Sequence, residues 1–252
     1  MSHHVTVLDF DETYDAQASL KGEGFDWLEL GSIPNTSLFC EKTSLKEISK
    51  QLEYYKQNKV TLLGNGNYHY VTYAILSKMK TPFTLILFDH HTDMGKSPAE
   101  NLLSCGSWVH EALKTLPFLE KVVIIGVSDD YEYYNSTNIH QHAFVLTEHD
   151  LHLHSNHYKT LLKQIPTEAI YISIDKDVLS EEDAVTAWDQ GSMKLKQLAS
   201  YIHVLLNEKD VLGIDICGEY PFSPEERFFE TVVEAVKKNE YANQYLLNHI
   251  LN

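Results

Sequence analysis

Two carboxylates and two imidazoles stand together at the end of a strongly hydrophobic run, in the segment LILFDHHTDM (85–94). Side chains of these types bind divalent metal ions and transfer protons in hydrolytic sites. The preceding FTLILF (83–88) is short and rich in branched aliphatic residues, which is typical of a strand buried on both faces of a parallel sheet. Loops at the carboxyl ends of such strands converge on a ligand-binding crevice. The pattern therefore favours a binding site over a polar loop that caps a helix.

Two further polar segments follow strand-like runs. GNGNYH (64–69) comes directly after VTLL (60–63), and SIDKD (173–177) overlaps the end of AIYISI (169–174). Because the carboxyl ends of parallel strands meet at one edge of a sheet, we expect all three polar segments to lie at that edge.

The spacing inside these segments brings carboxylates together. Alternate side chains of an extended segment point to the same side, so Asp89, His91 and Asp93 can converge, as can Asp175 and Asp177. Four carboxylates in one crevice repel each other unless cations compensate them, and two divalent ions would balance their charge. Carboxylate and imidazole ligands without a thiolate suit manganese better than structural zinc.

These segments resemble the signatures GGDHS, DAHxD and SxDxD of the arginase, agmatinase and formiminoglutamase (ureohydrolase) family. The resemblance runs from about Leu62 to Pro221; DHHTD and SIDKD are specific in combination, whereas GNYHY is a degenerate first motif. It implies a hydrolase that cleaves a non-peptide C–N bond of a guanidino, amidino or formimino compound through a metal-bridging hydroxide. It also implies two Mn²⁺ ions per chain as the cofactor.

The resemblance assigns the metal ligands residue by residue. It implies that one manganese ion is bound by His69, Asp89, Asp93 and Asp175. The second ion is bound or shared by Asp89, His91, Asp93, Asp175 and Asp177.

The sequence departs from the family pattern near the expected substrate. Cys105 in Ser-Cys-Gly (104–106) replaces a histidine associated with proton transfer, and WDQG (188–191) replaces a Pro- and Gly-rich turn. The glutamate of the family's DxxExxP segment corresponds to Gly218, with Glu219 one residue late. A slip of one residue reverses the side-chain direction unless a bulge restores it. We take Asp93, Cys105 and Glu219 as candidate catalytic residues, and we expect Cys105 near the metal centre without acting as a nucleophile.

Other histidines are expected outside the ligand set. His90 stands where the family usually has alanine, so we expect a packed or hydrogen-bonded neighbour. A second group follows no ligand spacing and is expected in a solvated region: His140, His142, His149, His152, His154 and His157.

Strands alternate with helical segments along the whole chain, which predicts a three-layer α/β/α fold with a mostly parallel sheet. With the resemblance, this is an arginase-like fold, in a single domain covering 1–252. Strands are expected at 5–10, 60–63, 83–88, 121–126, 143–146, 169–174 and 211–216. Helices are expected at 69–78, 107–115, 156–164 and 194–207, after the capping boxes Ser44/Glu47 and Ser223/Glu226, and at the end of the chain.

The composition limits the partners. The formal net charge of −16 argues against a nucleic-acid backbone or an anionic membrane, which leaves small molecules and other proteins as partners. With the family resemblance, we expect a small-molecule substrate. Cys40, Cys105 and Cys217 are too widely spaced for a disulfide framework or a zinc knuckle. No apolar run approaches a membrane span or a signal peptide, so we expect a cytoplasmic protein. A homo-oligomer is a family expectation.

Three alternatives compete with this interpretation. VLDFDET (7–13) matches the hydrophobic-DxDxT motif of haloacid dehalogenase phosphatases, which would make Asp9 a nucleophile. A single-zinc amidohydrolase of the histone-deacetylase type shares the DxH pattern but leaves His69 and Asp93 unexplained. A non-catalytic protein that keeps the metal site and senses a ligand would account for the missing histidine and glutamate.

Overall fold

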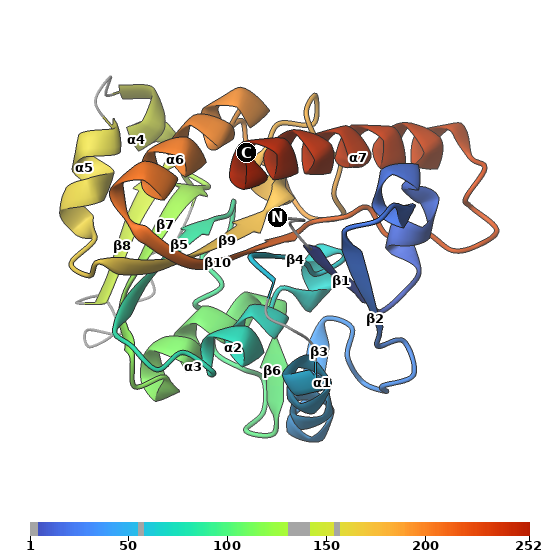
Figure 1. Cartoon of the computed structure of the whole chain (residues 1–252), viewed down its shortest axis with the longest axis horizontal. Helices are drawn as coiled ribbons and strands as arrows, with labels where there is room; N and C mark the ends of the chain where they lie inside the picture. Colours follow the sequence, from blue (N-terminus) through green and yellow to red (C-terminus); the bar gives the residue numbers. More distant parts are fainter. Residues whose placement is uncertain (1–4, 55–57, 131–141, 154–156) are drawn as a thin grey trace.

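A parallel sheet runs through the centre of the protein (Figure 1). The computed structural model describes residues 5–54, 58–130, 142–153 and 157–252, and within them the sheet has eight strands in the order β2-β1-β4-β10-β9-β5-β7-β8. Every pairing in it is parallel. The strands are β1 (Val5–Asp9), β2 (Phe25–Glu29), β4 (Val60–Leu62), β5 (Phe83–Phe88), β7 (Leu119–Val127), β8 (Ala143–Thr147), β9 (Ala169–Asp175) and β10 (Asp210–Cys217).

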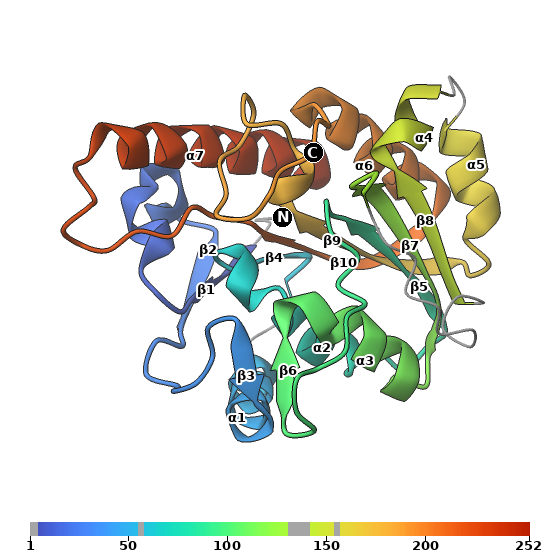
Figure 2. The ribbon, with the colours of Figure 1, turned by 180° about the vertical axis from the view of Figure 1, so that it is seen from behind.

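Helices cover both faces of this sheet, which confirms the expected α/β/α layers (Figures 1 and 2). One face carries α4 (Glu148–Leu153), α5 (His157–Gln164), α6 (Leu195–Glu208) and α7 (Glu230–Leu251). The other carries α1 (Lys42–Tyr54), α2 (Val71–Leu76) and α3 (Trp108–Thr115), beside a small antiparallel pair of β3 (Phe39–Glu41) and β6 (Leu102–Ser104). No described helix combines the length and the apolarity that crossing a bilayer requires.

Strand β5 shows why a continuous hydrophobic run was the right signal for a central strand. Ile86 and Phe88 belong to the core that also contains residues of α6 and α7, and Leu85 and Leu87 to the core that contains residues of α2 and α3. All four side chains are fully buried. Burying such a side chain stabilises the folded state by about 1.5–3 kcal/mol, and the side chains on both faces of β5 contribute in this way.

The strand order positions the three polar segments. Strands β4, β10, β9 and β5 are consecutive neighbours, and their registers pair Leu62 with Ile216, Cys217 with Asp175, and Ile174 with Phe88. The strands therefore end at the same level, and the segments that follow β4, β9 and β5 meet at one edge of the sheet.

Both capping-box predictions were wrong. Helix α1 begins at Lys42, and Ser44 inside its first turn donates its hydroxyl hydrogen bond to the Pro34 carbonyl, 2.7 Å away. Ser223 and Glu226 do form a turn, with the Ser223 N–H donating to Glu226 Oε2 at 2.9 Å. The last helix nevertheless begins only at Glu230. The intervening Phe228 is 86% exposed, so no buried apolar face stabilises a helix there.

Short elements also escaped prediction. Strands β3 and β6 have three residues each, and α4 has six. Segments of that length are too short to show a hydrophobic period. Strand β2 lies at the edge of the sheet, where four of its five residues are only partly buried or exposed.

Glycine is required at position 218, immediately after β10. The backbone there has φ of +87°, and a Cβ would lie 2.5 Å from Asp175 Oδ1 and 2.7 Å from the Lys176 backbone nitrogen. The expected family glutamate cannot occupy this position without displacing β9.

Gly218→Ala should therefore lower the free energy of unfolding by about 1–3 kcal/mol or more, through backbone strain and the clash with β9. Gly22→Ala is the matched control, because nothing lies within 4 Å of the added Cβ, and it should be neutral or slightly stabilising. Urea denaturation of both variants makes the comparison. Equal stabilities would contradict this account of Gly218.

Candidate metal centre

Three carboxylates surround one nitrogen of His69. His69 follows the 3-10 turn Gly66–Tyr68 after β4, and its side chain is 1% exposed. Its Nδ1 lies 3.1 Å from Asp93 Oδ2, 3.3 Å from Asp89 Oδ2 and 3.5 Å from Asp175 Oδ2. The segments after β4, β5 and β9 thus converge on one point.

A hydrogen-bond chain behind His69 sets which nitrogen faces the carboxylates. The Ser173 hydroxyl donates to Asp215 Oδ1 at 2.6 Å, so its oxygen accepts from His69 Nε2 at 2.9 Å. Nε2 therefore carries a proton, and Nδ1 faces three carboxylate oxygens. Burial opposes a charge on His69, but Cys217, Asp89 and Asp93 outweigh it and raise the pKa of His69, so Nδ1 is also protonated when no cation is bound. Outer hydrogen bonds orient metal-binding histidines in this way. The arrangement is repulsive unless a proton or a cation lies between the groups, so the donors fit a metal ion.

A second group forms around His91. Its Nδ1 lies 2.9 Å from Asp177 Oδ2 and 3.5 Å from Asp89 Oδ1. Asp89 therefore directs one oxygen toward His91 and the other toward His69. Burial opposes a charge on His91, but the bonds to Asp177 and Asp89 outweigh it and raise its pKa to about 11. The His91 side chain is therefore protonated near pH 7, and its positive charge lies between Asp89 and Asp177, where a metal cation would compensate the same carboxylates.

The carboxylates also perturb one another. Burial, followed by repulsion from neighbouring carboxylates that include Asp89, raises the pKa of both Asp175 and Asp177. Two overlapping sets of donor atoms result, His69/Asp89/Asp93 and Asp89/His91/Asp177. All six side chains singled out in the sequence therefore lie together, with Asp175 beside His69.

Asp93 is held by a residue that the sequence motifs did not indicate. Its backbone has φ of +51°, which is uncommon outside glycine, and its Oδ2 accepts a hydrogen bond of 2.6 Å from Trp108 Nε1. The Val109 N–H also donates to the Asp93 carbonyl. The start of α3 thus fixes a strained residue, as happens at functional sites. An aromatic residue opening a helix gives no such signal in the sequence.

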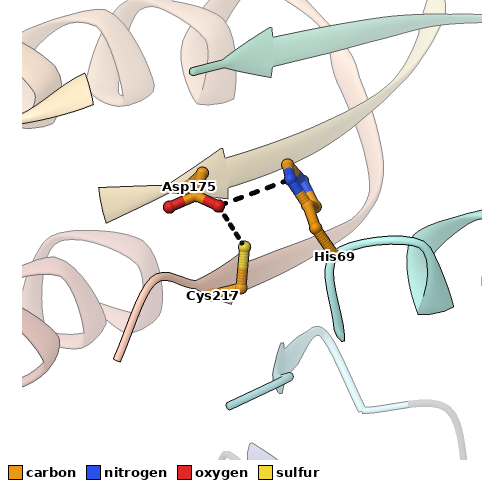
Figure 3. A group of neighbouring side chains, drawn as sticks. All are labelled: His69, Asp175 and Cys217. Carbon is orange, nitrogen blue, oxygen red and sulfur yellow. Dashed lines mark hydrogen bonds and ion pairs between the residues drawn. The ribbon is translucent and has the colours of Figure 1, made fainter. Parts of the chain in front are cut away.

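Cys217 is a further residue missed by the sequence analysis. It is fully buried, and its Sγ donates to Asp175 Oδ2 at 3.1 Å. With His69 and Asp175 it forms a third set of potential metal donors (Figure 3). The available signal was its place at the end of the run VLGIDIC (211–217), at the same sheet edge as the three motifs.

A cavity of about 540 Å³ opens onto this centre. Phe39 and Trp188 contribute apolar surface to it, and the exposed Asp130 and Asp189 add two negative charges. Among the described residues that line the cavity, none is lysine or arginine. The walls beyond the metal centre are therefore apolar and acidic.

Cys105 lines the same cavity, as does Asp93. Burial, and then the negative charge of Asp93, raise the pKa of the Cys105 thiol to about 12. The side chain is therefore neutral near pH 7, which agrees with a position near the centre and with no role as a nucleophile. The expected effect of changing Cys105 stays a prediction.

The remaining histidines contribute less to the site. His90 is buried, and its backbone N–H donates to Asp177 Oδ1 at 3.0 Å, as expected of a hydrogen-bonded neighbour. His142 and His149 are exposed. His140, His154 and the side chains of His152 and His157 lie outside the described part of the chain.

Glu219 is directed away from the cavity. It is 1% exposed, forms an ion pair with Lys176, and accepts hydrogen bonds of 2.8 Å from Gln17 Nε2 and Asn243 Nδ2. The positive φ of Gly218 turns the chain before this residue. Glu219 is not among the residues that line the cavity, so this placement gives no support to its candidate catalytic role.

Asp9 also lies outside the residues that line the cavity. Its Oδ1 accepts a hydrogen bond from the Glu12 N–H at 2.8 Å, and Asp11 is bonded to Thr13 and Asn65. The carboxylates of Asp9 and Asp11 are thus hydrogen-bonded to neighbouring residues of the protein. This placement gives no support to a phosphatase centred on Asp9.

Comparison with known proteins identifies the family. The model of the arginase family matches residues 4–235, and the chain belongs to this family. An uncharacterized protein of Thermotoga maritima is 33% identical over 217 residues, covering 86% of this chain and 80% of that protein.

Solved structures show the same fold at low sequence identity. Arginase from Bacillus cereus superposes with a TM-score of 0.72 and 14% identity, covering 99% of this chain and 98% of that one. Formimidoylglutamase from Bacillus subtilis superposes with a TM-score of 0.71 and 15% identity, covering 98% of this chain and 86% of that one. Proclavaminate amidino hydrolase from Streptomyces clavuligerus superposes with a TM-score of 0.69 and 14% identity, covering 98% of this chain and 92% of that one. The predicted arginase-like fold is confirmed.

The buried Lys176–Glu219 pair should be essential for stability. Lys176→Met or Glu219→Gln leaves one charge buried without its partner, and each should lower the free energy of unfolding by about 3–5 kcal/mol. The double variant should recover part of that loss. The exposed pair Lys194–Glu182 is the matched control, so Lys194→Met should change stability little. Urea denaturation measures all four; similar small effects at both pairs would contradict the structural role of Glu219.

Proposed function

We propose that this protein is a binuclear manganese-dependent hydrolase that cleaves a C–N bond of an amidino or guanidino compound. One observation carries the proposal. Six imidazole and carboxylate side chains gather around His69 Nδ1 and Asp89, at the sheet edge of a chain that belongs to the arginase family.

The donor sets suggest how the ions are shared. His69, Asp89 and Asp93, with Asp175 nearby, would hold one ion, and Asp89, His91 and Asp177 the other. When bound, two such ions supply Lewis acidity and a water activated for attack on an electron-poor carbon. The chain's own contribution is to fix these donors: Ser173 orients His69, and Trp108 orients Asp93.

The charge of the cavity bears on the substrate. Two divalent ions would balance Asp89, Asp93, Asp175 and Asp177, and would leave the exposed Asp130 and Asp189 uncompensated. A carboxylate on the substrate would meet no lysine or arginine among the described lining residues. A substrate whose tail carries an amine rather than a carboxylate suits this charge better.

A second candidate function is a metal-containing ligand sensor without turnover. It is favoured by Cys105, a thiol that is neutral near pH 7 where relatives have a proton-transferring histidine, and by Gly218 in place of a substrate-binding glutamate. A compound that raises the melting temperature of the metal-loaded protein without being hydrolysed would identify this function.

The metal prediction is that the purified protein binds two divalent ions per chain and that a chelator lowers its melting temperature, because the buried carboxylates then repel each other. Asp175→Asn should reduce the metal content, measured by elemental analysis. Asp9→Asn, which alters an acidic residue outside the cavity, should leave the metal content unchanged. One ion or none in a fully loaded chain would refute the binuclear proposal.

The substrate prediction compares agmatine, L-arginine, guanidinobutyrate and formiminoglutamate with the manganese-loaded protein, by release of urea or ammonia. Agmatine, with its amine tail, should be hydrolysed best and arginine poorly. Asp189→Asn should raise KM for agmatine by up to about fivefold, the range expected of an exposed charge, and should leave KM for the carboxylate-bearing compounds unraised. Efficient arginine hydrolysis by the wild type would show that the charge argument is wrong.

A further inference from the structure

Cys217 lies beside the metal centre and is not used by the proposed function. Its Sγ is 3.1 Å from Asp175 Oδ2, and that oxygen is 3.5 Å from His69 Nδ1. The side chains come from three separate elements: the end of β10, the end of β9 and the turn after β4 (Figure 3).

The spacing of these three donors fits a metal ion. Metal bonds of about 2.0–2.3 Å place neighbouring ligand atoms roughly 3.0–3.8 Å apart, from the right angles of a five- or six-coordinate site to the wider angles of a tetrahedral one. The Sγ–Oδ2 and Oδ2–Nδ1 separations of 3.1 and 3.5 Å lie in this range, and all three donor atoms lie within 4.8 Å of one another. Small side-chain rotations would bring them around one ion.

The surroundings hold this arrangement in place. Cys217 and Asp175 are paired in register between β10 and β9, and the Ser173 bond directs His69 Nδ1 toward Asp175. His69, Asp175 and Cys217 are 1%, 3% and 0% exposed. A buried cysteine commonly serves as a small hydrophobic residue. Here its sulfur instead contacts a carboxylate oxygen of Asp175 that also faces His69 Nδ1.

We propose that Cys217 is a ligand of the ion on the His69 side of the centre. This inference rests on the metal centre of the proposed function. When the ion binds, the S–H bond breaks, a sulfur–metal bond forms, and the proton is released to the buffer. A thiolate ligand favours softer ions, so Cys217 would raise the affinity of this half of the centre for zinc or cobalt(II) more than its affinity for manganese. The half formed by Asp89, His91 and Asp177 keeps oxygen and nitrogen donors and suits manganese.

Cobalt(II) provides a direct test, because a thiolate bound to it gives an intense charge-transfer band in the near ultraviolet. The full-length metal-free protein is titrated with cobalt(II) under reducing, anaerobic conditions. The wild type should show the band, and Cys217→Ser and Cys217→Ala should lack it. Cys105→Ser is the matched control, since Cys105 is a second buried thiol near the centre, and it should keep the band.

A competition measurement adds a second readout. Cys217→Ser should weaken zinc binding by at least about tenfold, because mutating even a residue that only hydrogen-bonds to a metal ligand lowers metal affinity by that factor or more. Manganese binding should weaken by a smaller factor. If the cobalt-loaded wild type lacks the band, the inference is wrong, and this result does not depend on whether the variants fold. The inference is also wrong if the band disappears in Cys105→Ser and persists in Cys217→Ser. Two bound ions without the band would refute this inference alone, whereas absence of metal binding would refute the proposed function as well.

Discussion

Repulsion among the buried carboxylates of Asp89, Asp93, Asp175 and Asp177 constrains every group around the metal centre. These carboxylates are between 1% and 8% exposed at the ends of the adjacent strands β5 and β9. Burying an uncompensated carboxylate costs several kcal/mol, so their neighbourhood must supply positive charge and hydrogen-bond donors. His69 and His91 lie among them, and donors from Trp108 and the backbone of His90 fix their orientations.

The sequence predicted the parts of this centre that depend on local spacing. The spacing of the motif indicated that Asp89, His91 and Asp93 lie close together, although they lie in the loop after β5 and Asp93 has a positive φ instead of the extended backbone expected. A hydrophobic run identified β5 as a buried central strand. Cys217 was missed because its neighbour Asp175 is set by the pairing of β9 with β10, and strand order cannot be read from periodicity. The direction of Glu219 was left open by the sequence, because it depends on the backbone conformation of Gly218, which has a positive φ.

The residues around the metal centre differ in how closely they follow the family pattern. All six expected ligand types are present. Cys105, Gly218 and Trp188, which depart from the pattern, lie close to the same centre: Cys105 lines the cavity with Asp93, and a Cβ at Gly218 would lie 2.5 Å from Asp175 Oδ1. Trp188 lies close to the centre because Gly66 has no side chain, since a Cβ there would lie 2.9 Å from Trp188 Cδ1. The expected ligands and the departures from the pattern therefore share one region of the structure.

The network around Lys176 joins distant parts of the chain. Lys176 stands between Asp175 and Asp177, and its partner Glu219 is bonded to Gln17, 202 residues away, and to Asn243 in α7. Asn243 and Gln17 are also bonded to each other, across 226 residues. Closing loops of this length costs conformational entropy, which the buried hydrogen bonds of the network must offset. The segment that carries Asp175 and Asp177 is thus tied to residues more than 200 positions apart in the chain, and a chain truncated before α7 would lose the bonds of Asn243 to Glu219 and Gln17.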